Sequence, residues 1–235
     1  MAEPALALAG VTAGYGETVV LEALDLTLGA GESLGILGRN GVGKTTLIDT
    51  IMGHTRLRAG SIRLGPQDIA RWPPWRRARA GLGYVPQERE IFPSLSVQEH
   101  LAIAVRPGPW TIERAYAAFP ALAERRRHQG EALSGGEQQM LAIARALVGN
   151  PTVLLMDEPT EGLAPIVVEQ LEATIKQLGR EEGMALVLVE QHADLALDFA
   201  PRCIVMDRGR IVYDGGSAEL AADRERLQSL IGVAR

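Results

Sequence analysis

The sequence predicts an α/β protein with a parallel-sheet core, an antiparallel β part and a helical subdomain. Val153–Met156 is an apolar run without alternation, which is typical of a parallel strand covered on both faces. Residues 5–37 and 61–64 contain short alternating or β-branched stretches between glycine turns, which indicates the antiparallel part. Residues 88–150 change to helical spacing. Together these patterns define the fold class.

The remaining elements follow from periodicity and from breaker residues. In the helical subdomain, Val97–Val105 and Ile112–Ala118 are predicted helices, and a Pro-Gly-Pro sequence separates them. Strands and helices alternate again over residues 151–212, where Val167–Leu178 has apolar residues at helical spacing. The segment Ser217–Ile231 predicts one or two short amphipathic helices. We see neither internal repeats nor low-complexity sequence.

Composition narrows the class of protein. The 235 residues are 46% apolar, which supplies a sizeable core, and no apolar run is long enough to span a bilayer. The N-terminus lacks a basic segment followed by an apolar one, so we expect a cytoplasmic or peripheral protein. The net charge of −5 argues against a general nucleic-acid surface. The one cysteine, Cys203, lies in an apolar stretch and is expected to be a buried thiol.

Two local clusters are basic, Arg76–Arg79 and Arg125–Arg127. We expect both to be solvated helix faces. The alternative interpretation is contact with a membrane subunit or with lipid headgroups.

The strongest motif is a glycine-rich loop between an apolar strand and a helix-compatible run. Its pattern is GxxxxGK[ST], the P-loop of nucleoside triphosphatases. The glycines let successive N–H groups face phosphate oxygens at the positive end of a helix dipole. Lys44 is expected to reach the β- and γ-phosphates, and the Thr45 hydroxyl to bind Mg²⁺. The predicted nucleotide-binding residues of this loop are Gly38, Asn40, Gly41, Gly43, Lys44, Thr45 and Thr46.

A second motif follows the apolar run that ends at Met156. Asp157 and Glu158 lie at the carboxyl end of this predicted strand, where α/β sheets bind their ligands. Asp157 is expected to hold Mg²⁺, and Glu158 to orient or deprotonate the attacking water. The alternative is an acidic strand cap at a turn, which Pro159 favours equally.

A third motif, the signature loop Leu133–Gln139, opens a predicted helix with the sequence LSGGEQQ. Ser134, Gly135 and Gly136 therefore stand at a helix N-terminus, which is a second anion-binding position, although Ser134 alone could be an ordinary N-cap. Two such positions in one subunit make sense when two subunits share the nucleotide. With these motifs, the sequence resembles the ATP-binding subunits of ABC transporters, where this loop closes on the γ-phosphate held by the other subunit.

The resemblance covers essentially the whole chain, residues 1–235, as one ABC ATPase domain. It implies a P-loop (RecA-like) nucleotide-binding core formed by residues 1–87 and 151–235, and a helical subdomain at 88–150 that includes the signature loop. It implies the cofactors ATP and Mg²⁺.

Three further residues match motif positions of the family. Tyr15 lies where an aromatic residue stacks on adenine, Gln87 matches the glutamine that contacts Mg²⁺ and the attacking water, and His192 matches the histidine that hydrogen-bonds the γ-phosphate.

The resemblance also implies partners and a location. These are a second ATPase subunit, paralogous or identical, in a head-to-tail dimer, integral membrane permease subunits, indirectly a periplasmic substrate-binding protein, and no nucleic acid. The chain would lie peripherally at the cytoplasmic face of the inner membrane. Glu88–Leu101 follows Gln87 directly, and Phe92 in this segment is expected either to dock a membrane-subunit helix or to pack in the subdomain's own core.

The segments Arg89–Pro93, Gly162–Val167 and Val189–His192 are similar to the ATPases of branched-chain amino-acid importers. The ATPases that import urea or short amides share the segments Gly38–Lys44, Val85–Gln87 and Thr160–Gly162. Ala164 stands where the family commonly has an aspartate. A soluble, non-transport ABC protein is the rival class, but the stretch from Gln87 to Leu133 leaves no room for its usual coiled-coil insertion. A P-loop kinase or G protein would leave the Ser134 loop without a role.

Overall fold

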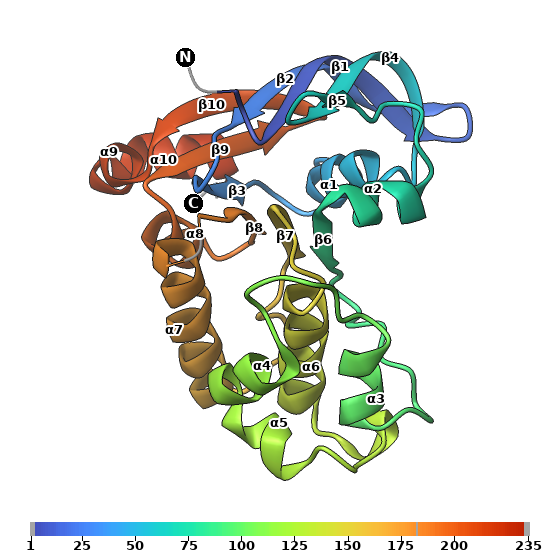
Figure 1. The fold of residues 1–235 in the computed structure, drawn as a ribbon. Helices are drawn as coiled ribbons and strands as arrows, with labels where there is room; N and C mark the ends of the chain where they lie inside the picture. Colours follow the sequence, from blue (N-terminus) through green and yellow to red (C-terminus); the bar gives the residue numbers. More distant parts are fainter. Residues whose placement is uncertain (1–2, 182, 233–235) are drawn as a thin grey trace.

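The computed structural model describes residues 3–181 and 183–232 and contains two sheets (Figure 1). The larger one is six-stranded, in the order β10-β9-β3-β8-β7-β6. Its strands from β9 to β6 are parallel, and β10 is an antiparallel edge. The strand bounds are β3 Ser33–Leu37, β6 Leu82–Val85, β7 Val153–Asp157, β8 Ala185–Val189, β9 Arg202–Asp207 and β10 Arg210–Gly216.

The smaller sheet is four-stranded and antiparallel, in the order β2-β1-β4-β5. Its strands are β1 Leu6–Tyr15, β2 Thr18–Leu28, β4 Arg56–Leu64 and β5 Gln67–Asp68. The assignment of all of residues 5–37 to antiparallel structure is therefore wrong at its end. Ser33–Leu37 pairs in parallel with β8 and β9 because it is buried along its whole length, as a central strand of a covered sheet must be.

Helices of the predicted subdomain lie together at the bottom of Figure 1, away from the antiparallel sheet. They are α3 Val97–Ala102, α4 Ile112–Ala118, α5 Pro120–Glu124, the short 3₁₀ helix Gly130–Ala132 and α6 Gly135–Leu147.

Helix α3 ends before the predicted Val105. Beyond it the Arg106 N–H donates to the carbonyl of Val148, and the Asn150 amide donates to the carbonyl of Arg106. These bonds lead the chain off the helical path just before Pro107.

The other helices flank the sheets. They are α1 Lys44–Met52, α2 Pro74–Ala80, α7 Pro165–Glu181, α8 Ala193–Phe199, α9 Ser217–Ala222 and α10 Arg224–Ile231. The predicted helix at Val167–Leu178 is thus confirmed, with two more residues before it and three more after it. The last segment forms two short helices, as expected. No helix in the described residues is long and apolar enough to cross a membrane.

The core has two main parts, one on each side of the parallel sheet. One cluster joins α1 to the antiparallel sheet and includes Leu47, Ile51 and Leu155. The other joins α6 and α7 to the opposite face and includes Leu141, Leu154 and Leu171, each almost fully buried. Neighbouring residues of β7 therefore face opposite clusters, which is why this strand shows no polar alternation.

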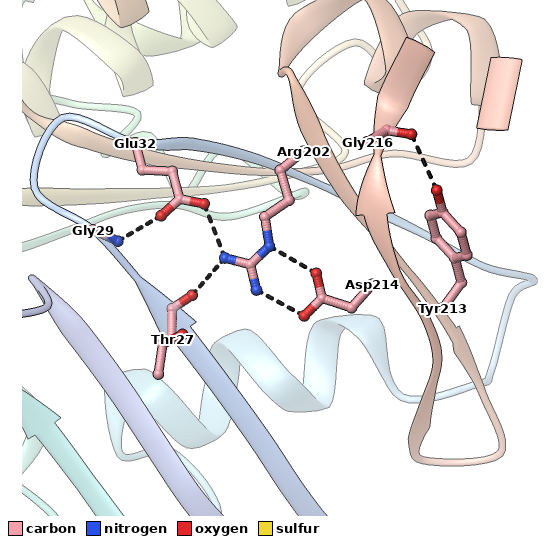
Figure 2. Close-up of polar contacts among 7 residues, drawn as sticks. All are labelled: Thr27, Gly29, Glu32, Arg202, Tyr213, Asp214 and Gly216. Carbon is pink, nitrogen blue, oxygen red and sulfur yellow. Dashed lines mark hydrogen bonds and ion pairs between the residues drawn. The ribbon is translucent and has the colours of Figure 1, made fainter. Parts of the chain in front are cut away.

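Arg202, on β9, links this strand to β2 and β10 (Figure 2). Its guanidinium makes two 2.7 Å hydrogen bonds to the Asp214 carboxylate, one of 2.9 Å to Glu32 and one of 2.8 Å to the carbonyl of Thr27. Glu32 also accepts from the Gly29 N–H. Because Asp214 and Glu32 stabilise its charge, the pKa of Arg202 is raised above its ordinary value. Nearby, the Tyr213 hydroxyl donates to the carbonyl of Gly216.

The structure corrects one expectation about the basic clusters. Arg77 is not on a solvated face but is buried, and its guanidinium donates to the carbonyls of Thr50 and Ile51 at the end of α1. A cation at a helix C-terminus satisfies carbonyls that have no intrahelical partner. The sequence reveals the charge of Arg77 but not these partners. Cys203 is buried, as expected, and burial raises its pKa.

Candidate functional site

The loop between β3 and α1 brings backbone N–H groups to the start of a helix. Gly43 is the N-cap of α1 at φ 108°, and no side chain caps it. Gly38 has φ 151°, and a methyl group on it would lie 2.6 Å from the carbonyl oxygen of Met206. Both positions therefore require glycine. The uncapped first turn of α1 leaves donors for an anion, which is the geometry that phosphate binding needs.

Lys44 lies within this loop and is almost fully buried. Its ammonium donates to the carbonyls of Gly38 at 2.9 Å and Arg39 at 3.2 Å, and lies 3.3 Å from a carboxylate oxygen of Glu158. Glu158 follows the last residue of β7 with φ 45°, a left-handed conformation that costs energy for a residue with a side chain. This turn aims its carboxylate at the loop.

Asp157, at the end of β7, is fully buried, and neither of its carboxylate oxygens has a hydrogen-bond partner among the described residues. Burial raises its pKa to about 6, while the nearby Thr45 hydroxyl and Lys44 ammonium act in the opposite direction. Buried carboxylate oxygens without a donor are costly unless a cation is bound. The carboxylate of Asp157 and the hydroxyl of Thr45 are oxygen ligands that suit a hard divalent ion such as Mg²⁺, which is bound by one or two carboxylates together with phosphate oxygens.

A cavity of about 270 Å³ lies over the loop. The structure brings most of the predicted phosphate and metal residues to it, and two unpredicted residues, Glu161 and Gln191, line it as well. The Gln87 amide donates to Glu161, and the Gln191 amide donates to Glu158 at 2.5 Å. The full lining is Asn40, Gly41, Gly43, Lys44, Thr45, Thr46, Gln87, Glu158, Glu161 and Gln191.

Several predicted site residues lie outside this lining. Tyr15 is part-exposed at the end of β1, and its hydroxyl donates to Asp49 at 2.6 Å. Burial, followed by the hydrogen bond to Asp49, raises its pKa to about 12. His192 is exposed at the N-cap of α8. The roles predicted for both side chains stay predictions.

The signature loop forms the start of α6, away from the cavity. The Ser134 hydroxyl accepts from the Glu137 N–H and the Glu137 carboxylate accepts from the Ser134 N–H, which is a capping box. The interpretation of Ser134 as an N-cap therefore holds. A methyl group on Gly135 would lie 3.0 Å from the Arg89 guanidinium, and one on Gly136 would lie 2.7 Å from Val167. These glycines let Arg89 and α7 approach the helix start closely.

One buried polar group near the cavity escaped sequence reasoning. Glu190 follows β8 and is almost fully buried. Its carboxylate accepts a 2.8 Å hydrogen bond from the hydroxyl of Thr160. Burial raises its pKa to about 7, and the charge of Glu158 acts in the same direction. Like Gln191, it lies at the carboxyl end of a parallel strand. The sequence does predict that position, which marks both residues as candidates for the site. It does not predict which residue, distant in the sequence, each side chain contacts.

These features define the chain as a nucleoside triphosphatase of the P-loop class: a glycine loop at a helix start, a buried lysine and two acidic residues at the end of the neighbouring strand. The sequence matches the ABC transporter family over residues 21–161, so the chain belongs to this family. It is an ATP-binding subunit of an ABC transporter and an ATPase.

Curated relatives cover nearly the same length. The chain is 39% identical to the high-affinity branched-chain amino acid transport ATP-binding protein BraG of Pseudomonas aeruginosa, over 92% of this chain and 95% of that one. It is 33% identical to the probable branched-chain amino acid transport ATP-binding protein LivF of Archaeoglobus fulgidus, over 94% and 95%. It is also 34% identical to the lipopolysaccharide export system ATP-binding protein LptB of Escherichia coli, over 91% of each.

Solved ATP-binding cassettes share the fold. One is a dimeric cassette in a post-hydrolysis state bound to ADP and Pi, with a TM-score of 0.78 and 26% identity over 90% of this chain and 98% of that one. The predicted fold class is confirmed.

Proposed function

We propose that this chain hydrolyses ATP to energise an importer of branched-chain or other hydrophobic amino acids. The observation that carries the proposal is the identity with BraG over almost the full length of both chains. LivF, at similar coverage, supports the same substrate class.

A second candidate is supported by the similarity to LptB, a component of an export system. The direction of transport is therefore the point that an experiment must decide. Among importers, urea and short amides remain the alternative substrates.

The proposed catalytic roles follow from the contacts in the cavity. Lys44 would bind the β- and γ-phosphates together with the N–H groups of the loop, leaving the carbonyls and carboxylate that it now contacts. Thr45, Asp157 and Gln87 would hold Mg²⁺, which neutralises charge on the phosphates when bound. Glu158 would accept the proton of the attacking water. Gln191, which donates to Glu158, would fix the direction of that carboxylate.

The proposed assembly is a head-to-tail dimer with an identical or paralogous ATPase subunit. In it, Ser134, Gly135 and Gly136 would supply the start of α6 to the nucleotide on the opposite P-loop. Tyr15 would contact adenine, and His192 the γ-phosphate. The exposure of Tyr15 and His192 in the single chain is compatible with contacts made only on binding and closure.

Docking to a permease is proposed at the segment that follows Gln87. Phe92 is 49% exposed, which favours the docking interpretation over the core one. Arg145 donates to the carbonyls of Arg89 and Glu90, and the buried His100 accepts from the Phe92 N–H at 2.9 Å. This segment is thus held in shape although Phe92 faces solvent. The chain would be peripheral at the cytoplasmic membrane face, with a periplasmic binding protein as an indirect partner.

Two experiments test the proposal. Purification from the native membrane should recover integral membrane subunits with this chain, and recovery of the chain alone would favour a soluble ABC protein. Uptake of labelled leucine and labelled urea in a strain without this gene then separates the substrates. We expect loss of leucine uptake, whereas normal uptake of both with defective lipopolysaccharide export would support the second candidate.

A further inference from the structure

Helix α2 and the turn before it expose a group of aromatic and basic side chains, which we call the α2 patch and define as Arg71, Trp72, Trp75, Arg76 and Arg79. Trp75 is 62% exposed, Trp72 is half-buried, and the three arginines are exposed. The helix lies beside α1 at the edge of the molecule (Figure 1).

Two of the three arginines of the patch lie against its rings rather than against carboxylates. The Arg76 guanidinium is 3.9 Å from the centre of the Trp72 ring, and that of Arg79 is 5.9 Å from the Trp75 ring. None of the three arginines forms an ion pair with another described residue. On a chain with a net charge of −5, the patch is therefore a local site of uncompensated positive charge.

The patch is built on a rigid base. Besides its bonds to the end of α1, the buried Arg77 donates to the carbonyls of Trp72 and Ala70 at 2.9 Å. Two prolines, Pro73 and Pro74, fix the start of α2. The buried Arg77 guanidinium thus links the turn before α2 to the end of α1, so the backbone that carries Trp75 and Arg76 has a fixed position beside α1.

The second basic cluster, Arg125–Arg127, provides a contrast. Arg125 lies 3.4 Å from the Glu137 carboxylate, so part of its charge is compensated. No large apolar side chain is exposed among the described residues from 106 to 165. This cluster has exposed charge without an aromatic surface.

We propose that the α2 patch binds the anionic headgroups of phospholipids at a membrane surface. Tryptophan favours the headgroup level of a bilayer because its ring is apolar and its N–H is polar. Guanidinium groups pair with phosphate in a bidentate geometry, and anionic lipids attract basic clusters. The patch combines both chemistries on one fixed helix. This function goes beyond ATP hydrolysis and does not depend on the transported substrate.

The test is sedimentation of the purified full chain with vesicles of phosphatidylglycerol and phosphatidylcholine, or of phosphatidylcholine alone. We expect binding to the anionic vesicles only, weakened by salt. The double variant Arg76→Glu/Arg79→Glu should bind at least about 25-fold more weakly, since each basic residue near an anionic surface contributes about fivefold. Trp75→Ala, which keeps the charge, should also weaken binding.

The matched control is Arg126→Glu/Arg127→Glu, which changes the net charge equally, and it should bind within about twofold of wild type. ATP hydrolysis by each variant reports that it is folded. Equal losses in both double variants would overturn the proposal in favour of diffuse charge attraction. Absence of wild-type binding to anionic vesicles would also overturn the proposal. If, in addition, the Arg76→Glu/Arg79→Glu variant no longer copurified with membrane subunits, the patch would be a protein contact.

Discussion

The Lys44 ammonium lies 3.3 Å from the Glu158 carboxylate, and both side chains are buried in the wall of the same cavity. This contact joins the phosphate-binding loop to the residue proposed as general base. Nucleotide phosphates would compete with Glu158 for Lys44, because both are anions and the ammonium has three donors. Binding of the nucleotide would therefore release the carboxylate toward the water that it must activate.

Glu158→Gln is the first test of this relationship. The amide keeps the size of the side chain but cannot accept a proton, so ATP turnover should fall at least about a hundredfold. ATP binding should be retained, because Lys44 and the loop N–H groups are unchanged. Steady-state hydrolysis and equilibrium binding of a labelled ATP analogue measure the two effects. Turnover near the wild-type rate in the assembled transporter would assign the base to another group.

Sharing of the nucleotide between subunits is tested at the start of α6. Ser134→Arg places bulk and charge where the opposite phosphate should approach, so Mg-ATP should no longer drive dimerisation. Because Ser134 is also an N-cap, its loss alone costs about 1 kcal/mol. Ser134→Ala is therefore the matched control, and it should remain closer to wild type. Sedimentation with Mg-ATP gives the dimer fraction, and a dimeric Ser134→Arg variant would contradict the shared site.

The success and failure of sequence reasoning have a common physical cause. The P-loop and the Asp157–Glu158 pair are local motifs whose spacing along the chain fixes their chemistry. The structure brings most of the P-loop and Glu158 to one cavity, and Asp157 directly precedes Glu158 at the end of β7. The burial of Arg77 and the contact of Gln191 with Glu158 depend on partners far away in sequence. A charge or an amide in a sequence does not reveal such a partner. Ser33–Leu37 was assigned to the wrong sheet for the same reason, because strand pairing is long-range.

The buried pair of Glu190 and Thr160 predicts a pH effect on stability. The folded-state pKa of Glu190 is raised to about 7, above the ordinary value near 4.5. Because the folded state binds the Glu190 proton more tightly than the unfolded state, the protonated carboxyl stabilises the fold at pH values below the unfolded pKa. This stabilisation is lost as pH rises through about 7. Glu190→Gln cannot ionise and still offers an acceptor to Thr160. Its free energy of unfolding should therefore exceed that of wild type at pH 8 by on the order of 3 kcal/mol.

Urea denaturation of wild type and Glu190→Gln at pH 5 and pH 8 measures this difference. Thr160→Val should instead destabilise the protein at both pH values, because it leaves a buried carboxyl without its donor. If Glu190→Gln raised the free energy of unfolding equally at pH 5 and pH 8, ionisation of Glu190 would not be the cause of the increase.

Phe92→Ala tests the coupling of ATP hydrolysis to transport. The side chain is 49% exposed, and its ring lies 5.7 Å from the His100 ring and 5.6 Å from the Arg145 guanidinium. The partners that shape this segment bond to its backbone, namely the Phe92 N–H and the carbonyls of residues 89 and 90. Truncation of the ring should therefore leave folding and ATP hydrolysis by the isolated chain nearly unchanged. Transport by the assembled complex should be lost, because the docking surface for the permease is removed.

Val212→Ala supplies the matched control for Phe92→Ala. Val212 is a comparably exposed apolar residue, but it lies on the edge strand β10, away from the helical subdomain. Its truncation should affect neither ATP hydrolysis nor transport. The measurements are thermal unfolding, ATP hydrolysis by the isolated chain, and substrate uptake by the reconstituted complex. A parallel loss of stability and ATPase in Phe92→Ala would mean that the ring is part of the subdomain core, because a side chain that only docks a partner cannot stabilise the free chain.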